Sequence, residues 1–582
     1  MIQFASKASR EWQAQETDGP LVRRLTKELG VDPLLATLLV NRGVGTKDSA
    51  EAFLTPSVND LLDPFGLIDM ELAAERMAKA IVDHERILVY GDADVDGLTS
   101  TGLLVQFLRM LSVEPLVYVP NRAYEGYSFT PAGVEHVLQS GAQLVVSVDN
   151  GISSIEPVRQ ITEAGIDVII TDHHMPSDTL PPAHAVVNPK RVDCGYAFKG
   201  LAGVGVAFKL ACAVSSRLHR RHQLSDAMGR FLGESLAWVC MGTVSDMMPL
   251  REENRVLVTR GLRALPRSTA PGLAALCRVS GMGEAADCRA EDIAFRLAPR
   301  LNAATRMGRS DLSVALVTAR DPNEATRLAG LLDEANKNRQ AAERELLAEL
   351  EPLLAEQPLD EPVLLSSERW NTGLLGLVAG RVSRERGLPV VLISSLQGDP
   401  AKGSCRSVPG FDAHAALAAC DEHLETHGGH PGAAGFSIRT EALPAFREAF
   451  FEQWQEQTAD DAGVQPKTYE SEVLLSSLTP KLVKAIDSLE PFGKSNPRPA
   501  LVTGGVLLRE ARQMGSDGQH LALTVAQGDA VMRAVAFSRG HWADQLPSGS
   551  LIDVLYTPKF NHFRGRTTVE LEIQDVRPSR IS

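Results

Sequence analysis

The sequence lacks long apolar runs, paired cysteines and a recognisable leader. No apolar stretch approaches the roughly 18 residues that cross a bilayer, so we expect no association with a membrane. The first residues, MIQFASKASREW, lack the apolar core of a secretory signal. The seven cysteines are scattered and never spaced as Cys-x-x-Cys, which excludes a disulfide framework and a zinc site built on paired thiolates. These absences predict a cytoplasmic protein.

The chain also lacks the positive charge that is expected of a nucleic-acid-binding protein. Its 59 Lys and Arg residues are outnumbered by 73 Asp and Glu residues, which gives a net charge of −14. Binding to phosphates requires a local positive potential rather than a positive total, so this balance argues only weakly against nucleic acid. The other bulk values, 44% hydrophobic and 5% aromatic residues, are typical of a globular protein, and 582 residues predict roughly three or four domains.

Five segments differ in their hydrophobic pattern. Residues 1–75 are expected to be helical, and residues 325–360 form a long amphipathic stretch that predicts a connecting helix. In residues 76–324, helical patterns alternate with short apolar runs, which is typical of a parallel sheet in an α/β domain. The runs are Ile87–Tyr90, Leu144–Val148, Val168–Ile170 and Val186–Val187. Residues 361–460 repeat this α/β pattern on a smaller scale. Residues 466–582 alternate with a period of two, which favours a C-terminal OB-like β-barrel.

Acidic residues and histidines follow the predicted strands of the larger α/β domain. Asp92, Asp94 and Asp96 alternate directly after the run Ile87–Tyr90. Alternate residues of an extended segment share a face, and three carboxylates on one face repel one another unless cations lie among them. Because the carboxyl ends of parallel strands meet at one crevice, further donors are expected to join the same site. These donors are Asp149, Asp172, His173, His174 and, in a later apolar context, Asp246.

The types of donor predict the kind of metal. Oxygen and imidazole ligands without thiolates favour manganese or magnesium over zinc. A calcium loop would share the D-x-D-x-D-G pattern, but no glutamate follows at the required offset. A single aspartate after a strand is usually a turn or a helix cap, whereas this coincidence at several strand ends predicts one site. Two divalent ions, Mn²⁺ or Mg²⁺, would suit phosphoryl chemistry because a pair of ions holds both the attacking and the phosphate oxygens.

The motifs resemble the DHH phosphoesterase superfamily and, within it, the RecJ exonuclease family. The acidic run, Asp149, the Asp-His-His triplet and Asp246 carry the superfamily pattern. Five further segments resemble RecJ in particular, and with them the resemblance covers nearly the whole chain. They are VPNRAYEGY, FRLAPRLNAATRMGR, SCRSVPGFD, GGHPGAAGF and LEPFGKSNPRPAL. The resemblance implies that residues 76–324 are a DHH catalytic domain, residues 361–460 a DHHA1 domain and residues 466–582 a nucleic-acid-binding domain.

The resemblance implies a metal-dependent exonuclease that removes nucleotides from the 5′ end of single-stranded DNA in repair and recombination. His174 would face the scissile phosphate, Asp149 would bridge two ions, and Asp92 and Asp172 would support the site. The implied metal ligands are Asp94, Asp96, Asp149, His173 and Asp246. Some superfamily members have a histidine ligand where this chain has Tyr90, so one metal site is expected to be weaker. A single-strand-binding protein and a helicase are the implied partners, and we expect a monomer.

The resemblance also implies contacts to DNA. A guanidinium reads a terminal phosphate by bidentate contact, and Arg122, Ser404 and Arg406 resemble the family's 5′-phosphate pocket. The barrel would add basic and aromatic contacts. The expected DNA-binding residues are Arg122, Arg300, Asn302, Arg306, Ser404, Arg406 and His430, together with Lys559, Phe563 and Arg564 in the barrel.

Four positions depart from the family pattern, and two other functions stay open. Ala93 replaces a common tyrosine, Thr305 and Cys405 replace glycines, and Ser495 varies a Gly-x-Gly-Asn segment. None of these changes removes an expected ligand. A DHH phosphodiesterase for short oligonucleotides or cyclic dinucleotides would share the acidic residues but would not need the barrel. A DNA-binding relative with a decayed site would have lost some of them.

Overall fold

The computed structural model describes residues 11–122, 125–218, 225–283, 287–458, 466–515, 517–563 and 566–579. The chain divides into two compact units. We call Asp63–Asp246 together with Gly261–Gly463 the sheet unit, and Met1–Leu62, Met247–Arg260 and Val464–Ser582 together the barrel unit. The barrel unit therefore contains segments from both ends of the chain.

A five-stranded parallel sheet forms the first half of the sheet unit. Its order is β3-β2-β4-β5-β6, with the bounds β2 Ile87–Tyr90, β3 Leu116–Tyr118, β4 Leu144–Val148, β5 Asp167–Thr171 and β6 Ala185–Val187. All residues of β2 and β4 are buried, as is expected of strands that are covered on both faces. The predicted apolar runs at β2 and β4 coincide with the strands, and those at β5 and β6 lie within them.

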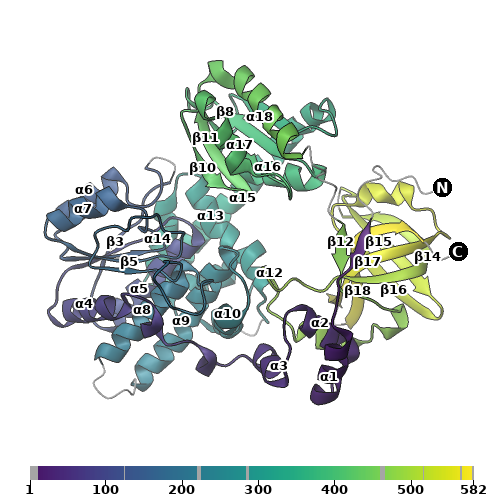
Figure 1. Ribbon diagram of the computed structural model, residues 1–582, viewed down its shortest axis with the longest axis horizontal. Helices are drawn as coiled ribbons and strands as arrows, with labels where there is room; N and C mark the ends of the chain where they lie inside the picture. The colour runs from purple at the N-terminus through teal and green to yellow at the C-terminus, as the bar shows by residue number, and fades with distance from the viewer. Residues whose placement is uncertain are drawn as a thin grey trace. The chain divides into compact units, whose positions relative to one another are not determined.

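Helices cover both faces of this sheet (Figure 1). On one face lie α4 (Met70–Val82), α5 (Val95–Met110) and α8 (Gly203–Leu218), and on the other lie α6 (Pro131–Ser140) and α7 (Ile155–Glu163). The chain runs from β2 through α5 to β3 on one side of β2, and then through α6 to β4 on its other side. The strand order therefore reverses between β2 and β4, and ligands bind at such a switch point, beyond the carboxyl ends of the strands.

Further helices complete this half of the sheet unit. They are α9 (Asp226–Ser245), α11 (Pro271–Val279), α12 (Ala290–Asp292), the π-helical segment η4 (Ile293–Leu297), α13 (Ala298–Arg306) and α14 (Ser310–Thr318); α10 (Glu252–Ala264) spans the border of the two units. The predicted connecting helix is α15 (Pro322–Ala355), which has Asp321 as its N-cap and Pro322 in its first turn. Leu346 and Leu350 of α15 share a core with α16, so this helix links the two halves of the sheet unit.

The second half of the sheet unit is a mixed sheet of order β10-β11-β9-β8-β7. The bounds are β7 Val363–Ser367, β8 Val390–Ser394, β9 Ala401–Arg406, β10 Thr426–His430 and β11 Ala433–Ile438. Only β7 and β8 pair in parallel, across the helix α16 (Thr372–Arg386). Alternate side chains of these strands pack on α16 and α15 or on α17 (Ala413–Ala419) and α18 (Leu443–Thr458), so both faces are covered.

A closed five-stranded barrel forms the core of the barrel unit. The strands are β14 Leu501–Met514, β15 His520–Gln527, β16 Ala530–Ala536, β17 Leu551–Phe563 and β18 Arg566–Pro578. Their order is β14-β15-β16-β18-β17, and β17 pairs again with β14, which closes the barrel. β16 and β18 pair in parallel, whereas the other neighbours in the barrel are antiparallel. The OB-like barrel that the alternating pattern predicts is therefore confirmed.

The N-terminal segment packs on this barrel. It contains α1 (Gly19–Leu29), α2 (Pro33–Asn41) and α3 (Lys47–Leu54), and Leu34, Leu38 and Leu39 share a core with barrel residues. The segment was expected to be helical, but it also contains strand β1 (Trp12–Ala14), which pairs in parallel with β12 (Lys467–Tyr469). Three residues are too few to show a period of two, and the partner strand lies far along the chain. The boundary at residue 75 stays a prediction.

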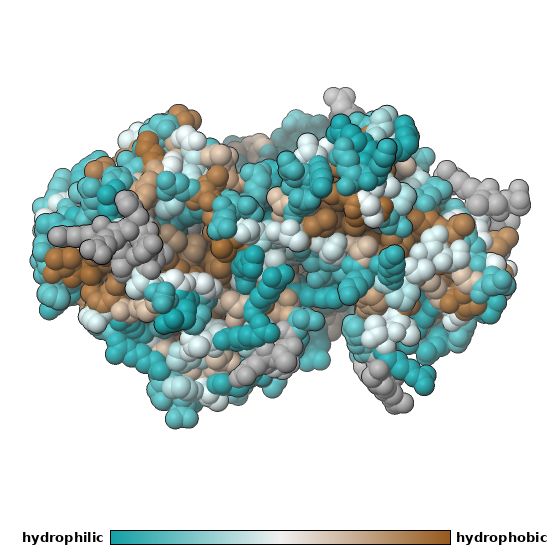
Figure 2. All heavy atoms as spheres, turned by 90° about the horizontal axis from the view of Figure 1, so that it is seen from below, coloured by the Kyte–Doolittle hydropathy of each residue, from teal (hydrophilic) through white to brown (hydrophobic). Residues whose placement is uncertain are grey.

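The surface is mixed in character. On the face in Figure 2, hydrophilic side chains lie between separate patches of hydrophobic ones. In the parts of the chain that the structure describes, no helix is both long enough and apolar enough to cross a membrane.

Candidate metal centre and arginine cluster

The loop after β2 supplies three carboxylates. Asp94 is the N-cap of α5, and its Oδ1 accepts hydrogen bonds from the backbone N–H groups of Asp96 (3.0 Å) and Gly97 (3.1 Å). The buried carboxylate of Asp96 accepts from the N–H groups of Gly203 (2.7 Å) and Val204 (2.9 Å). These two groups begin α8, where the helix dipole stabilises a negative charge. Backbone N–H groups at the N-termini of α5 and α8 thus hold the carboxylates of Asp94 and Asp96.

Asp149 follows β4 in a left-handed backbone conformation, with φ 62°. Residues other than glycine rarely adopt this conformation, and at a crevice such strain is often functional. The carboxylate is buried, and its Oδ1 accepts no hydrogen bond from any described residue. A Cβ atom at position 203 would lie 2.4 Å from this oxygen, so α8 approaches Asp149 only because residue 203 is glycine.

The loop after β5 supplies two imidazoles and a carboxylate that orients one of them. Oδ1 of Asp172 accepts from the backbone N–H groups of His173 (2.7 Å) and His174 (3.0 Å) and lies 2.7 Å from Nδ1 of His174. The hydrogen bond with Asp172 raises the pKa of His174 to about 9. Burial, followed by the neighbouring His174, lowers the pKa of His173 to about 4, so its imidazole is neutral and able to bind a metal.

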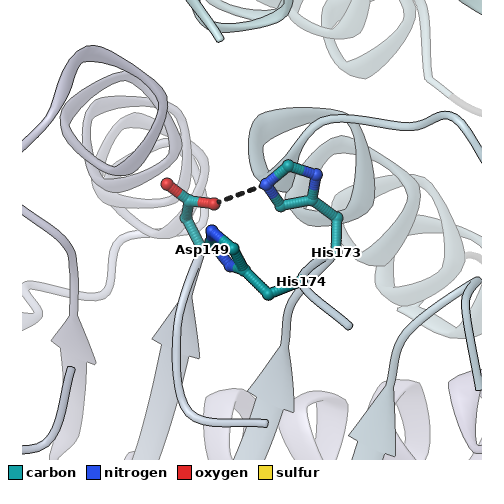
Figure 3. A group of neighbouring side chains, drawn as sticks. All are labelled: Asp149, His173 and His174. Carbon is teal, nitrogen blue, oxygen red and sulfur yellow. Dashed lines mark ion pairs between the residues drawn. The ribbon is translucent and has the colours of Figure 1, made fainter. Parts of the chain in front are cut away.

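The side chains from different strands meet at the switch point. Nε2 of His173 lies 3.2 Å from Oδ1 of Asp149, the contact that Figure 3 marks with a dashed line. It also lies 3.8 Å from Asp96 and 3.6 Å from Asp246, which follows the C-terminal end of α9. A Cβ atom at position 242 of α9 would lie 2.6 Å from Oδ1 of Asp96, so a glycine there allows α9 to approach. His173 is therefore surrounded by three carboxylates.

The donors form three overlapping groups that are able to hold cations, each with ligand atoms within 4.8 Å of one another. They are Asp92, Asp94 and Asp149; Asp96, His173 and Asp246; and Asp149, His173 and His174. Burial and the charges of neighbouring carboxylates raise the pKa of Asp96 and of Asp149 well above the usual range. Both ring nitrogens of His173 are buried without a hydrogen bond to any described residue. Orphaned donors among crowded carboxylates fit divalent cations such as Mn²⁺ or Mg²⁺.

Arg122 connects this centre to a cluster of arginines. Its guanidinium lies 2.6 Å from Asp92 and 3.0 Å from Asp94, and 4.7 Å from the ring centre of Tyr127. Burial acts to raise the pKa of Asp94, but the charge of Arg122 and the N–H of Gly97 outweigh it, so the pKa is lowered. The pKa of Asp92 is raised, because burial outweighs the effect of Arg122. Arg122 thus contacts one expected metal ligand and one supporting residue.

Arg306 and Arg406 also belong to the arginine cluster. Burial, and then the charges of Arg339, Arg406 and Arg122, lower the pKa of Arg306, although part of its side chain is exposed. Arg406 donates to Oγ of Ser404 (2.9 Å). A Cβ atom at position 376 in α16 would lie 2.3 Å from the Arg406 guanidinium, so a larger residue there would displace this guanidinium. Among the described residues, neither Arg306 nor Arg406 has a carboxylate within 4.0 Å, and such a cluster suits an anion.

The remaining residues expected to bind DNA lie in other settings. Arg300 is engaged by Asp333 of α15 (2.9 Å), Asn302 is half-buried on α13, and His430 is exposed at the end of β10. Lys559 lies 2.5 Å from Glu572 on the barrel. The side chain of Phe563 and all of Arg564 lie outside the described residues. The DNA contacts of these residues stay predictions.

Several residues that shape the site were not predicted from the sequence. Gly203, Gly242 and Gly376 lie where a side chain would clash with Asp149, Asp96 or Arg406. The amide of Asn150 donates to the carbonyl groups of Val148 (3.0 Å) and Tyr90 (3.4 Å), which ties the ends of β4 and β2 together. The only signal in the sequence was glycine inside helical patterns and a polar residue directly after Asp149.

Cys405, which replaces a glycine of the family pattern, points away from the arginine cluster. Successive side chains of a strand point to opposite faces, so Ser404 and Arg406 share one face of β9 and Cys405 takes the other. Cys405 is fully buried in the core formed with α17 and α18, and this burial raises its pKa to about 12. A buried thiol with a raised pKa is a poor nucleophile, so Cys405 is a core residue rather than part of the arginine cluster.

Three known families match successive parts of the chain. The DHH family N-terminal domain matches residues 86–236, the DHHA1 domain residues 360–456 and the RecJ OB domain residues 469–575. A parallel sheet with carboxylates and imidazoles at its switch point, followed by a second α/β domain, thus defines a protein of the DHH/DHHA1 class.

Full-length relatives narrow the assignment. The single-stranded-DNA-specific exonuclease RecJ of Bacillus subtilis is 34% identical over 98% of this chain and 71% of that protein. The protein of the same name from Salmonella typhimurium is 32% identical over 98% of this chain and 100% of its own length. The crystal structure of Thermus thermophilus RecJ in complex with Mn²⁺ matches with a TM-score of 0.82 at 30% identity, covering 98% of this chain and 80% of that one. The chain belongs to the RecJ family.

Proposed function

We propose that this protein is a metal-dependent exonuclease that hydrolyses single-stranded DNA from the 5′ end. The observation that carries this proposal is the direct contact of Arg122 with Asp92 and Asp94. Through Arg122, an anion-binding arginine cluster adjoins the candidate metal centre within one unit of the chain. An enzyme that cuts beside a strand end needs this juxtaposition, because it must bind the terminal phosphate and the scissile phosphate together.

The residues at the switch point would divide the chemistry between them. Asp94, Asp96, Asp149, His173 and Asp246 would hold two divalent cations, with Asp149 common to two of the three donor groups. Bound cations supply Lewis-acid stabilisation of the charge that develops on the phosphoryl oxygens. Asp172 holds His174 by Nδ1, which leaves Nε2 to carry a proton toward the scissile phosphate. Asp92 would orient Arg122 through their ion pair.

End recognition would depend on the arginine cluster. Arg306, Arg406 and Ser404 offer donors without competing carboxylates, and Arg122 offers its guanidinium between the cluster and the metal ligands. A terminal phosphate carries more negative charge than a phosphodiester, so it binds such a cluster more strongly. The cluster would seat the 5′ phosphate and place the following linkage at the metal centre. This arrangement would give 5′→3′ polarity.

The barrel would guide the strand. OB domains bind single strands by stacking bases on aromatic side chains and contacting phosphates with basic ones. Relatives with the same three domains are named single-stranded-DNA-specific exonucleases, which supports the same substrate here. Contacts of Lys559, Phe563 and Arg564 with the strand, a cytoplasmic location, a monomeric state, and single-strand-binding protein and helicase partners belong to this proposal.

An assay of polarity and strand preference tests the proposal. Oligonucleotides labelled at the 5′ or the 3′ end are incubated with the purified protein and Mn²⁺ or Mg²⁺. We expect metal-dependent release of nucleotides from the 5′ end of single strands, with blunt duplexes resistant. Equal digestion of single strands and blunt duplexes would contradict the proposal. Faster cleavage of a dinucleotide or a cyclic dinucleotide than of a long strand would instead favour the alternative DHH phosphodiesterase, which has no use for the barrel.

A further inference from the structure

The end of helix α13 contacts three functional parts of the sheet unit. We call residues 305–308 the α13 turn. Oγ1 of Thr305 donates a buried hydrogen bond to the carbonyl of Ala93 (3.0 Å), between Asp92 and Asp94. Arg306 donates to the carbonyl of Gly373 in the first turn of α16 (3.3 Å). The carbonyl of Gly308 accepts from the side chain of Asn121 (3.0 Å), the residue before Arg122.

Each of these contacts reaches a segment that is itself tightly held. The N–H of Ala93 donates to Oδ1 of Asp92 (2.6 Å), so both backbone groups of Ala93 are engaged. The N–H of Asn121 donates to Glu125 (2.9 Å), which also accepts from the hydroxyl of Tyr118 (2.5 Å) at the end of β3. A Cβ atom on Gly373 would lie 2.5 Å from the carbonyl oxygen of Arg306. The α13 turn therefore has little freedom to move without moving its neighbours.

We propose that Thr305 is a positioning residue that couples the arginine cluster to the metal carboxylates. An anion bound by Arg306 fixes the α13 turn, and the hydrogen bond from Thr305 to Ala93 transmits this restraint to the loop that carries Asp92 and Asp94. The 5′ phosphate and the metal ions then strengthen each other's binding. Glycine, the usual residue at this position in the family pattern, has no hydroxyl with which to make this bond. The inference rests on the proposed function.

Coupling of this kind is reciprocal and directly measurable. If a bound 5′ phosphate tightens Mn²⁺ binding, then Mn²⁺ must tighten binding of the 5′ phosphate by the same factor. Mn²⁺ binding is measured by electron paramagnetic resonance in the presence of a strand with nuclease-resistant phosphorothioate linkages. The strand carries either a 5′ phosphate or a 5′ hydroxyl. In the wild-type protein, we expect tighter Mn²⁺ binding with the 5′ phosphate.

Two substitutions at position 305 and one matched control test the role of the hydroxyl. Thr305→Val keeps the shape but removes the donor, and we expect it to weaken Mn²⁺ binding about threefold to tenfold and to abolish the difference between the two strands. Thr305→Ser restores the donor and should restore both properties. Thr318→Val removes a hydroxyl whose partner among the described residues is the carbonyl of Val314 in its own helix (2.8 Å), and it should change neither.

The outcomes separate this inference from the proposed function. Wild-type Mn²⁺ binding and wild-type discrimination in Thr305→Val would overturn the coupling role. Equal losses in Thr305→Val and Thr305→Ser would overturn it too, because the hydroxyl would then be irrelevant. If Thr305→Val has a lowered Tm, recovery of Mn²⁺ binding in Thr305→Ser would still show that the hydrogen bond is required. Failure of the wild-type protein to cut any single strand would refute the nuclease proposal, while the Mn²⁺ measurements would still test Thr305.

Discussion

The two sheets of the sheet unit present opposite charges. In the parallel sheet, the loops after β2, β4 and β5 carry carboxylates and imidazoles, and backbone N–H groups hold Asp94 and Asp96 in place. In the mixed sheet, β9 ends at Arg406, which packs against α16 and meets no carboxylate among the described residues. The ends of the parallel strands thus gather groups that could hold cations, whereas β9 ends at a guanidinium that could bind an anion.

This difference shows two ways of assembling a site. In a parallel sheet, the topology alone brings the ends of the strands together, so the donors converge wherever the chain places them after a strand. In the mixed sheet, the guanidinium of Arg406 lies in the space beside Gly376 of α16, which is a property of packing. Changes at the first site should abolish cation binding, whereas changes at the second should weaken the recognition of anions and leave cation binding without DNA unchanged.

The largest effect is expected from Asp149→Asn. This substitution removes the carboxylate that is common to two donor groups, and we expect Mn²⁺-dependent nuclease activity to fall about a thousandfold. In the metal-free protein, the same change relieves repulsion among buried carboxylates and should raise Tm by about 2–4 °C. Activity assays and thermal melts with a chelator measure both effects. Asp311→Asn, in an exposed ion pair with Arg309, is the control, and wild-type activity in Asp149→Asn would refute the assigned site.

A smaller effect should follow from Arg406→Ala. We expect the KM for 5′-phosphorylated single strands to rise about tenfold to a hundredfold, because a charge-assisted contact with the phosphate is lost. Mn²⁺ binding without DNA should stay unchanged, and Arg406→Lys should recover only part of the loss, since lysine lacks the planar fork. Arg381→Ala, in an exposed ion pair on α16, is the control. An equal rise in KM for 5′-hydroxyl strands would show that Arg406 does not read the 5′ end.

The contrast between topology and packing also explains how much of the structure could be predicted from the sequence. The buried strands of the parallel sheet are continuous apolar runs, so β2 and β4 were predicted to the residue, and their polar successors pointed to a shared crevice. The long helix α15 was also predicted, because its amphipathic pattern is local. The strand β1 and the packing of α2 on the barrel were not, because their partners lie several hundred residues away.

The glycines near the metal centre illustrate the same limit. Gly242 lies inside α9, where glycine is locally unfavourable, and Gly203 is the first residue of α8. The reason for glycine at these positions is found only in the folded structure, where Asp149 and Asp96 approach them from other elements. The residues that could bind a metal can therefore be identified from the sequence. The glycines that leave room for their side chains can be recognised only in the folded structure.

A third prediction tests this space requirement. Gly203→Ala places a Cβ atom 2.4 Å from Oδ1 of Asp149, and we expect Mn²⁺ binding to weaken about tenfold and stability to fall by about 1–3 kcal/mol. Gly229→Ala, on α9, is the matched control, because apart from the adjacent backbone of its own helix no described atom lies within 4 Å of the new Cβ; it should stabilise the helix by about 0.5–1 kcal/mol. Metal titration and chemical denaturation measure the two effects. Wild-type Mn²⁺ binding in Gly203→Ala would mean that α8 can move away from Asp149 and make room for the added methyl group.

The smallest effect is expected at Arg300, where the resemblance and the structure point in different directions. The resemblance implies a contact with DNA, whereas the structure pairs this guanidinium with Asp333 of α15 at 2.9 Å, with both side chains largely buried. If the ion pair is its main role, Arg300→Met should leave the KM for DNA within about twofold and lower stability by about 1–2 kcal/mol.

A double-mutant cycle decides between these roles of Arg300. If the two side chains act on each other, Arg300→Met and Asp333→Asn should each destabilise the protein, and the double variant should lose less than the sum of the two. Denaturant unfolding measures this coupling, and nuclease assays on single strands supply the KM of each variant. A tenfold rise in KM without a loss of stability would instead place Arg300 on the DNA path. The arginine cluster would then extend along α13 toward α15. Arg300 would in that case contribute both to the stability of the fold and to DNA binding.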